Sequence, residues 1–168
     1  MGVNTWHSET SREEKQAKWW ELIKDLISLA NANSNFLDQK KYLIIGYCEK
    51  EKKFKDVKLD TDIGTLKQEI TKRFNTFVKK PITNINIIKE SIHENDVLVI
   101  EILPHSYFFE LKKDLQNDGV TYRANSIIVR GIEKSDEISL ADSDEIGRIT
   151  SYFKNNDIFF PEDNENYR

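Results

Sequence analysis

The sequence has little cysteine, glycine or proline. Its 168 residues include one cysteine, six glycines and three prolines. A single cysteine, Cys48, excludes a disulfide framework within the chain and fits a reducing compartment. We interpret Cys48, which falls at the end of an expected strand, as a small buried apolar residue rather than a reactive thiol. Because glycine and proline are scarce, long flexible linkers are not expected, and the length suits one domain.

The sequence also lacks long apolar runs and an excess of positive charge. No run approaches the roughly 18 apolar residues of a membrane-spanning helix, and the N-terminus has no apolar signal-peptide core. We therefore expect a cytoplasmic protein without a membrane partner. The formal net charge is −4, whereas domains that bind nucleic acid are commonly basic. Any nucleic-acid contact must therefore come from a local basic patch.

Motifs of several enzyme classes are missing. The chain has no GxxxxGK[ST] phosphate loop, no GxGxxG turn and no GxSxG elbow, so the sequence supports neither nucleotide-dependent nor serine-hydrolase chemistry. His7, His93 and His105 are far apart in sequence and outside any HExxH or CxxC setting. We expect them to be surface histidines rather than metal ligands. Carboxylates and basic side chains remain as candidates for function.

Apolar residues three and four apart predict three amphipathic helices. The helices are expected over residues 11–32, 60–78 and 142–154. Ser11 is the expected N-cap of the first helix, Thr61 or Asp62 of the second, and Asp142 of the third, because these side chains accept hydrogen bonds from the first amides of a helix.

Short apolar runs bounded by turn residues predict strands. These runs cover residues 41–48, 84–90, 96–103, 120–123 and 126–130. A hairpin or a short second strand is expected within 50–58, and an edge strand over 107–111. The run 42–45 does not alternate with polar residues, so both faces of its strand should be covered. Asn95 and Asp96 are expected to form the turn of a hairpin.

The order of these elements predicts an α/β (α+β) fold. We expect a single domain with a mixed β-sheet of about five to six strands flanked by about three helices. The domain is expected over residues 1–154, followed by an acidic tail over 155–168. Within the strand 96–103, alternation predicts that Val97, Val99 and Glu101 face one way and the residues between them the other.

Four carboxylates stand at places where elements begin or end. Glu9, Glu13 and Glu14 lie before or within the first turn of the first helix, and Glu49 follows the first strand. Acidic residues at a helix start are explained by the helix macrodipole alone, and Glu49 is explained as a solvated turn residue. Alternatively, the carboxylates converge and bind Mg²⁺ or Mn²⁺, which would activate water for phosphoryl displacement.

Arg130 differs from the other basic residues because it ends an apolar strand and precedes Gly131. Its guanidinium could bind a phosphate with two hydrogen bonds, or it could form a structural ion pair. The remaining basic residues are interleaved with acids and are interpreted as a solvated surface of mixed charge. They are Lys50, Lys52, Lys53, Lys55, Lys58, Lys72, Arg73, Lys79, Lys80, Lys112, Lys113 and Arg123.

Several segments, in order, resemble those of the Schlafen-type AlbA-like domain. SETSREEK, KDLISLANAN and YLIIGYCEKE resemble its opening glutamate, first helix end and first strand. RFNTFVKKPI, VLVIEILPHSYFFELKKD, and SIIVRG followed by SLADSDEI resemble its later segments. The resemblance extends over residues 8–152. Members of this family bind nucleic acid, and some resemble metal-dependent endonucleases with three acidic residues.

The resemblance implies three hypotheses. The first is nucleic-acid binding, to RNA or DNA, with phosphate contacts from Lys50, Lys52, Lys53 and Arg130. The second is an endonuclease whose catalytic carboxylates are Glu9, Glu13 or Glu14, and Glu49. In that hypothesis Glu9, Glu14 and Glu49 would bind the Mg²⁺ or Mn²⁺ ion, and otherwise no cofactor is expected.

The third hypothesis is an assembly module of a defence or regulatory system. Such a module would form a homo-oligomer or bind a partner subunit. Tyr107, Phe108 and Phe109 would then be exposed anchors of the interface, since aromatic side chains often carry the binding energy of an interface.

Overall fold

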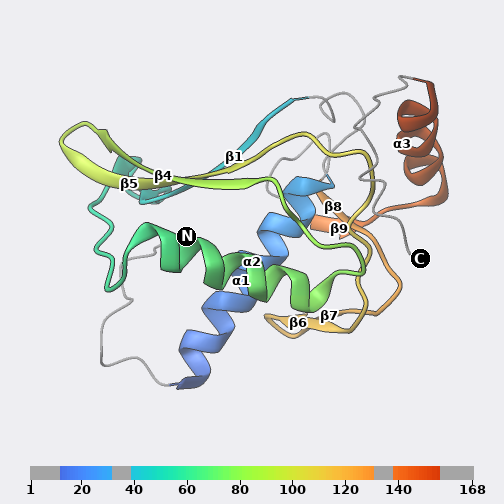
Figure 1. Cartoon of the computed structure of the whole chain (residues 1–168). Helices are drawn as coiled ribbons and strands as arrows, with labels where there is room; N and C mark the ends of the chain where they lie inside the picture. The colour runs from blue at the N-terminus through green and yellow to red at the C-terminus, as the bar shows by residue number, and fades with distance from the viewer. Residues whose placement is uncertain (1–11, 32–38, 131–137, 156–168) are drawn as a thin grey trace, which may run out of the picture.

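The computed structural model describes residues 12–31, 39–130 and 138–155 (Figure 1). Three helices and nine short strands alternate along the described chain, which confirms the predicted α+β class. The helices are α1 (Arg12–Ala30), α2 (Ile63–Phe77) and α3 (Ser143–Asn155). The strands are β1 (Lys41–Ile45), β2 (Tyr47–Cys48), β3 (Lys53–Phe54), β4 (Ile85–Ile92), β5 (Asn95–Ile102), β6 (Leu115–Asn117), β7 (Val120–Tyr122), β8 (Ile128–Arg130) and β9 (Ile138–Leu140).

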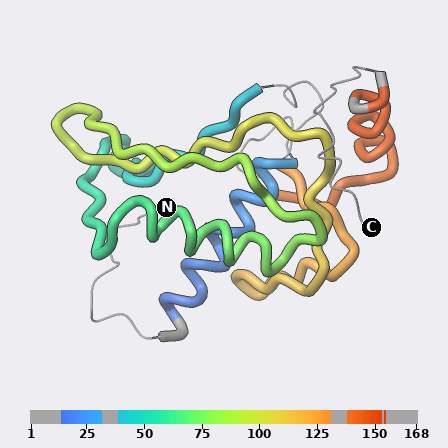
Figure 2. The backbone as a smooth tube through the Cα atoms, in the orientation of Figure 1, coloured from blue at the N-terminus to red at the C-terminus, as the bar shows by residue number. Residues whose placement is uncertain are grey.

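The strands form small antiparallel sheets in place of one mixed sheet. The largest has the order β1-β5-β4, and the pairs β2-β3, β6-β7 and β8-β9 form two-stranded sheets. Each two-stranded sheet joins strands that are consecutive in the chain, so local pairing satisfies the backbone of these short segments. Figure 2 shows the β4–β5 hairpin extending past the helices as a long arm.

The register of the three-stranded sheet decides which side chains reach the core. Ile100 of β5 lies opposite Leu43 of β1 and Ile87 of β4. Ile100 is fully buried, and α1 and α2 lie on one side of the sheet (Figure 1). Val99 and Glu101 lie opposite Ile44 and Tyr42 and face the other way, as alternation predicted.

The core joins both helices to the segment after β5. Phe74 of α2 and Phe109 are fully buried, and their rings meet edge to face with centroids 5.0 Å apart. Asn31, 1% exposed, follows the end of α1 and fixes this packing. Its Nδ2 donates to the carbonyl oxygens of Phe109 and Ile128, each at 3.0 Å, and its Oδ1 accepts from the Phe109 amide at 2.8 Å. One side chain therefore holds three distant segments together.

The predicted helix caps agree with the structure where they are described. Asp62 precedes α2, and its Oδ1 accepts a hydrogen bond from the Thr65 amide at 2.9 Å. Asp142 precedes α3 and accepts from the Glu145 amide at 2.7 Å. Both bonds satisfy amides that have no partner within the helix. Ser11 lies outside the described residues.

Gly46 divides the predicted strand 41–48 into β1 and β2. Its φ is +117°, a conformation that side-chain-bearing residues rarely adopt. A Cβ at this position would lie 2.9 Å from Val57 Cγ2 and 3.0 Å from Val97 Cγ1. The chain therefore turns here only because the residue has no side chain, and the β2–β3 hairpin follows.

Two local predictions about the sheet are wrong. The turn of the β4–β5 hairpin is formed by His93 and Glu94, whose φ angles are 49° and 64°, while Asn95 already pairs with Ile92. The second error concerns β1, whose outer face is not covered by described residues. Tyr42 is 52% exposed and Ile44 is 45% exposed, because only the opposite face of the sheet meets the helices.

Glu101 occupies the same outer face but is shielded by polar neighbours. Its Oε2 accepts from Asn86 Nδ2 at 2.9 Å, and its Oε1 lies 3.0 Å from Lys40 Nζ and 3.4 Å from the Tyr42 hydroxyl. These contacts, the hydrogen bond from Asn86 first and that from Lys40 next, lower the pKa of the Glu101 carboxyl. Glu101 therefore stays ionised on a sheet face that also carries the exposed Tyr42 and Ile44.

Candidate nucleic-acid interface

The predicted acidic residues are not brought together where the structure describes them. Glu14 is exposed near the start of α1, and Glu49 is exposed in the turn between β2 and β3. Figure 1 shows the first turn of α1 and the β2–β3 hairpin on opposite sides of α2. Glu9 and the side chain of Glu13 lie outside the described residues, so the three-glutamate site and its Mg²⁺ or Mn²⁺ stay predictions.

The described ranges also hold no group of side chains placed to bind a metal. Within them, no three histidine, cysteine, aspartate or glutamate side chains lie close enough together to hold a metal ion. Seven of the described carboxylates instead form ion pairs with lysine or arginine.

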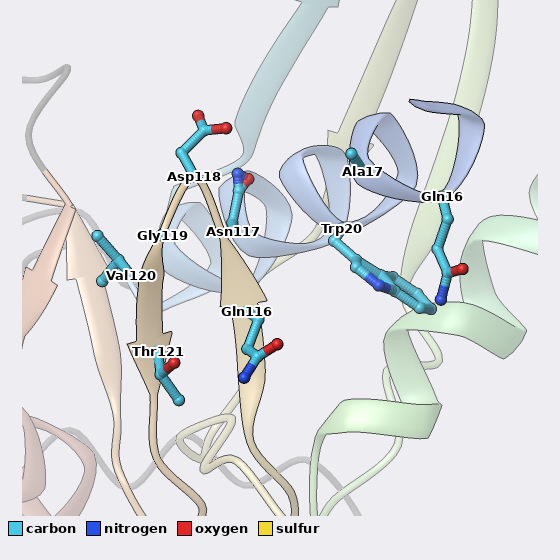
Figure 3. Close-up of a pocket in the computed structure, with 9 residues that line it drawn as sticks. All are labelled: Gln16, Ala17, Trp20, Gln116, Asn117, Asp118, Gly119, Val120 and Thr121. Atoms are coloured by element: carbon cyan, nitrogen blue, oxygen red, sulfur yellow. The ribbon is translucent and has the colours of Figure 1, made fainter. Parts of the chain in front are cut away.

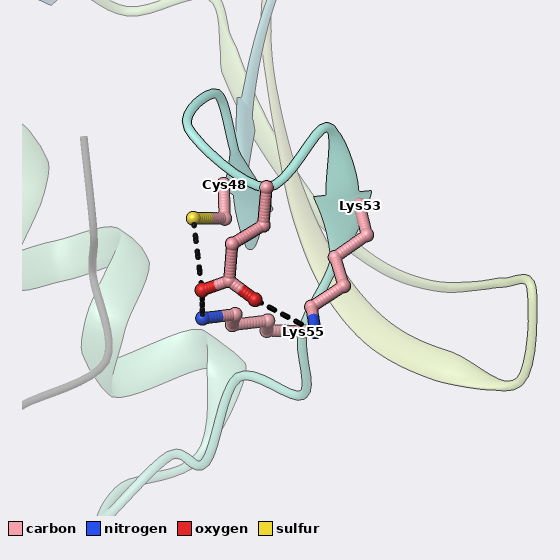
Figure 4. Close-up of polar contacts among 4 residues, drawn as sticks. Cys48, Lys53 and Lys55 are labelled. Atoms are coloured by element: carbon pink, nitrogen blue, oxygen red, sulfur yellow. Dashed lines mark hydrogen bonds and ion pairs between the residues drawn. The ribbon is translucent and has the colours of Figure 1, made fainter.

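The β2–β3 hairpin holds a local ion cluster (Figure 4). Glu51 lies between two lysines, with Lys53 Nζ 2.6 Å from its Oε2 and Lys55 Nζ on its Oε1. Hydrogen bonds from Lys53 and then Lys55 lower the pKa of Glu51 to about 2. The half-buried Cys48 thiol also points at Oε1, at 3.6 Å. The charge of Lys53 is therefore compensated within the hairpin.

Lys50 and Lys52 lie at the tip of this hairpin and are exposed. Lys52 has a φ of 51°, so it occupies a tight turn. Lys50 and Lys52 were predicted to contact phosphate, and both are exposed to solvent in the turn between β2 and β3.

Arg130, at the end of β8, faces a buried carboxylate. Its Nη2 lies 3.7 Å from Asp25 Oδ1, and the two side chains are 22% and 6% exposed. Lys24 Nζ lies at the same distance from that oxygen. Burial raises the pKa of the Asp25 carboxyl, and the charges of Lys24 and Arg130 oppose the rise. Of the two roles considered for Arg130, phosphate binding and a structural ion pair, this geometry corresponds to the ion pair.

A different basic surface forms where α2 ends, and we call it the α2-exit surface. Two segments separated by 31 residues meet there: the Lys79 amide donates to the Glu110 carbonyl at 2.9 Å, and the Lys112 amide donates to the Phe77 carbonyl at 2.7 Å. Val78 and Leu111 form an isolated bridge between these bonds. The α2-exit surface comprises Lys72, Arg73, Lys79, Lys80, Lys112 and Lys113.

The α2-exit surface is positively charged, whereas the chain as a whole has a negative net charge. Its six cations face two carboxylates: Arg73 Nε lies 3.0 Å from Glu69 Oε2, and Lys79 Nζ lies 2.6 Å from Glu110 Oε1. The cluster therefore carries +4 within a chain of net charge −4. Such a local field attracts polyanions even though the whole protein is acidic.

Aromatic rings lie under three of the cations. The Arg73 guanidinium is 4.4 Å from the Trp19 ring, Lys113 Nζ is 4.4 Å from the Phe77 ring, and Lys80 Nζ is 4.8 Å from the Tyr107 ring. A ring leaves the charge of the cation above it uncompensated, whereas a carboxylate offsets that charge, and Arg73 has both kinds of partner. Cations interleaved with aromatic rings are the combination by which proteins hold single-stranded nucleic acid.

The position of one of these lysines, Lys112, is explained by a contact with the C-terminal end of α2 and needs no ligand. Lys112 Nζ donates to the Asn75 carbonyl at 2.7 Å, in the last turn of α2, where carbonyl groups lack intrahelical partners. The remaining exposed lysines, Lys72, Lys80 and Lys113, make no such contact with a helix carbonyl among the described interactions. Lys80 and Lys113 instead lie over the rings of Tyr107 and Phe77.

Two predictions about aromatic and histidine residues are corrected. Phe109 is fully buried against Phe74 and cannot anchor an interface, because the strand bridges at Glu110 and Leu111 turn its side chain inward. His105 is 8% exposed rather than on the surface, and burial lowers its pKa to about 4.

The cations of the α2-exit surface are recognisable in the sequence, but their grouping on one surface is not. They lie in two segments far apart in the chain, which the Val78–Leu111 bridge and the backbone hydrogen bonds beside it place side by side. The aromatic partners give no separate signal, since Trp19 and Phe77 also follow the apolar period of their helices.

Comparison with known proteins adds no assignment: no family model, no curated protein and no solved structure matches this chain. Among the described helices, none has the length and apolar character needed to cross a membrane.

Proposed function

We propose that this protein binds nucleic acid through the α2-exit surface. The observation that carries the proposal is the clustering of six cations, three of them over aromatic rings, on a chain whose net charge is negative. The resemblance of the sequence motifs to the Schlafen-type AlbA-like domain points to the same class of ligand. The single cysteine supports a cytoplasmic location for this activity.

The charges available at this surface give the expected strength of the salt dependence. Two of the six cations are paired with carboxylates, so about four remain to replace counterions on a phosphate backbone. Four contacts with a single strand predict a slope of about −2.8 for log K against log salt concentration. Affinity should then fall roughly 50-fold between 50 and 200 mM salt.

The test replaces two of the cations by a neutral residue of similar shape. In the double variant Lys80→Gln/Lys113→Gln, the glutamine side chains keep a polar head and most of the aliphatic stem but lose the charge. The matched control is Lys50→Gln/Lys52→Gln, which removes the same charge from the β2–β3 hairpin. Binding of a fluorescent 20-nucleotide single strand is measured by anisotropy at 50 mM salt.

We expect the Lys80/Lys113 variant to bind roughly 50-fold more weakly than the unmodified protein, since each lost contact removes nearly a factor of ten at this salt concentration. The control should change affinity by less than about threefold, because its residues lie outside the α2-exit surface. Equal losses in both variants would place binding elsewhere. Absence of any binding to single- or double-stranded RNA or DNA at 50 mM salt would refute the proposal.

A further inference from the structure

A pocket of about 430 Å³ opens between α1 and the β6–β7 hairpin (Figure 3). Gln16, Ala17 and Trp20 of α1 form one wall. Residues 116–121 of the hairpin form the other. The volume lies in the lower part of the range that small-molecule sites occupy, about 300–1,000 Å³. The pocket is therefore large enough for one planar ring system and too small for a folded segment of a partner.

The lining chemistry favours a neutral ligand with both donors and acceptors. Side-chain amides come from Gln16, Gln116 and Asn117, and the Trp20 indole provides an aromatic surface (Figure 3). Each amide offers two donors and a carbonyl acceptor. Oδ1 of Asn117 is buried without a hydrogen-bond partner among the described residues, so this amide has unused capacity. Asp118 is the charged residue of the lining, and a carboxylate disfavours phosphate inside the pocket.

Two contacts with the Phe77 ring link the pocket to the α2-exit surface. The Trp20 ring meets the Phe77 ring edge to face, with centroids 4.9 Å apart. Lys113 Nζ lies 4.4 Å from the same Phe77 ring. A phosphate held at Lys113 would therefore have its attached nucleoside within reach of the pocket.

We propose that this pocket holds one unstacked base of a single-stranded nucleic acid, beside Trp20 and against the amides of the β6–β7 hairpin. The proposal rests on the proposed function for its phosphate contacts and adds the recognition of a base. Proteins that read single strands place splayed bases on aromatic side chains and bond their Watson–Crick edges with polar groups, and this lining supplies both elements.

Asp118 gives the pocket a selectivity. A carboxylate accepts a hydrogen bond from the exocyclic amine of cytosine and repels the carbonyl that thymine or uracil carries at the same position. Asp118 lines the pocket at the tip of the hairpin, in a tight turn with a φ of 48°, followed by Gly119 with a φ of 76°. The pocket should therefore prefer cytosine over thymine or uracil.

The experiment compares three labelled single-stranded decamers of equal charge: oligo-dC, oligo-dT and a backbone of abasic sites. Anisotropy at 100 mM salt gives their affinities. We expect oligo-dC to bind about five- to tenfold more tightly than oligo-dT, as one good hydrogen-bonded contact allows. The abasic strand should bind at least tenfold more weakly than oligo-dC, since stacking on a ring is lost.

The test variant is Asp118→Asn, which keeps a residue that tolerates positive φ but removes the carboxylate. It should abolish the preference for oligo-dC over oligo-dT. The matched control, Glu94→Asn, makes the same charge change at another positive-φ turn, with φ 64°, and should leave the preference intact. A preference that survives Asp118→Asn would refute the assigned role of this carboxylate.

Failure of the pocket and failure of the proposed function give different results. If all three decamers bind equally and with a steep salt dependence, the proposed function stands and the base pocket is refuted. If no decamer binds at 100 mM salt and no single- or double-stranded RNA or DNA binds at 50 mM salt, the proposed function fails, and the uncharged nucleosides cytidine and uridine test the pocket alone. Cytidine should then shift the side-chain amide NMR signals of Gln16 and Gln116 more than uridine does, and no shift with either nucleoside would refute the pocket.

Discussion

Replacing Asn31 by alanine should destabilise the protein more than any exposed substitution. Asn31 is 1% exposed and ties the end of α1 to Phe109 and to Ile128 of β8 through three hydrogen bonds of 2.8–3.0 Å. Alanine removes all three bonds and leaves the amide and carbonyl of Phe109 and the carbonyl of Ile128 without these partners. These groups are buried, so water cannot replace the lost bonds without opening the core.

The three bonds set the size of the effect. A typical buried hydrogen bond contributes about 1 kcal/mol net, and a backbone group left unpaired costs more. We therefore expect a loss of about 3–5 kcal/mol in the free energy of unfolding, which is a large part of the 5–15 kcal/mol that domains have in total. With a urea m value near 2 kcal/mol/M, the midpoint should fall by roughly 1.5–2.5 M.

Urea unfolding followed by circular dichroism and tryptophan fluorescence measures this loss. The matched control is Asn84→Ala, which removes an exposed side-chain amide whose oxygen receives one weak bond, 3.3 Å from the Thr83 hydroxyl. The control should change stability by less than about 0.5 kcal/mol. A loss below about 1 kcal/mol for Asn31→Ala would show that the three bonds do not hold the segments together as described.

Two further substitutions test the sheet. Gly46→Ala should cost roughly 2 kcal/mol in thermal or urea unfolding, because φ is +117° and the new Cβ would meet Val57 and Val97; a neutral result would contradict this backbone geometry. Glu101→Gln tests pH dependence. The folded pKa of Glu101 is lowered, so its contribution is present above the ordinary value of 4.5 and is lost as pH falls through the folded pKa. The stability advantage of the unmodified protein over the variant should therefore shrink below about pH 4.5, and an advantage that grows there would have the wrong sign.

Local sequence signals predicted the helices and their caps well. The caps Asp62 and Asp142 were identifiable because a carboxylate just before an apolar helical pattern commonly accepts hydrogen bonds from the first amides of the helix. The two faces of β5 were likewise readable from alternation, since successive side chains must point to opposite faces.

Predictions that depended on what covers an element were less accurate. The run from Tyr42 to Ile45 is apolar, yet Tyr42 and Ile44 are exposed, because no described helix lies over that face of the sheet. The sequence of a strand shows that it is apolar, but it does not show whether other elements cover both faces of the sheet. The buried position of His105 follows from the same kind of tertiary packing, which its neighbours in sequence do not reveal.

The candidate site was the least predictable part. Arg130 was readable as a phosphate ligand or an ion pair, and only the fold places it beside Asp25. The α2-exit surface arises from the pairing of segments separated by 31 residues, as the contact of Lys79 with Glu110 shows. Each segment separately looks like an ordinary solvated stretch of mixed charge.

The salt dependence of binding tests the central claim most directly, because its slope counts phosphate contacts. For a single-stranded 20-mer, log K against log salt concentration should have a slope of about −2.8 for the unmodified protein and about −1.4 for Lys80→Gln/Lys113→Gln. The Lys50→Gln/Lys52→Gln protein should keep the steeper slope. The same slope for the Lys80/Lys113 variant and the unmodified protein would contradict the account, because it would mean that these two lysines release no counterions.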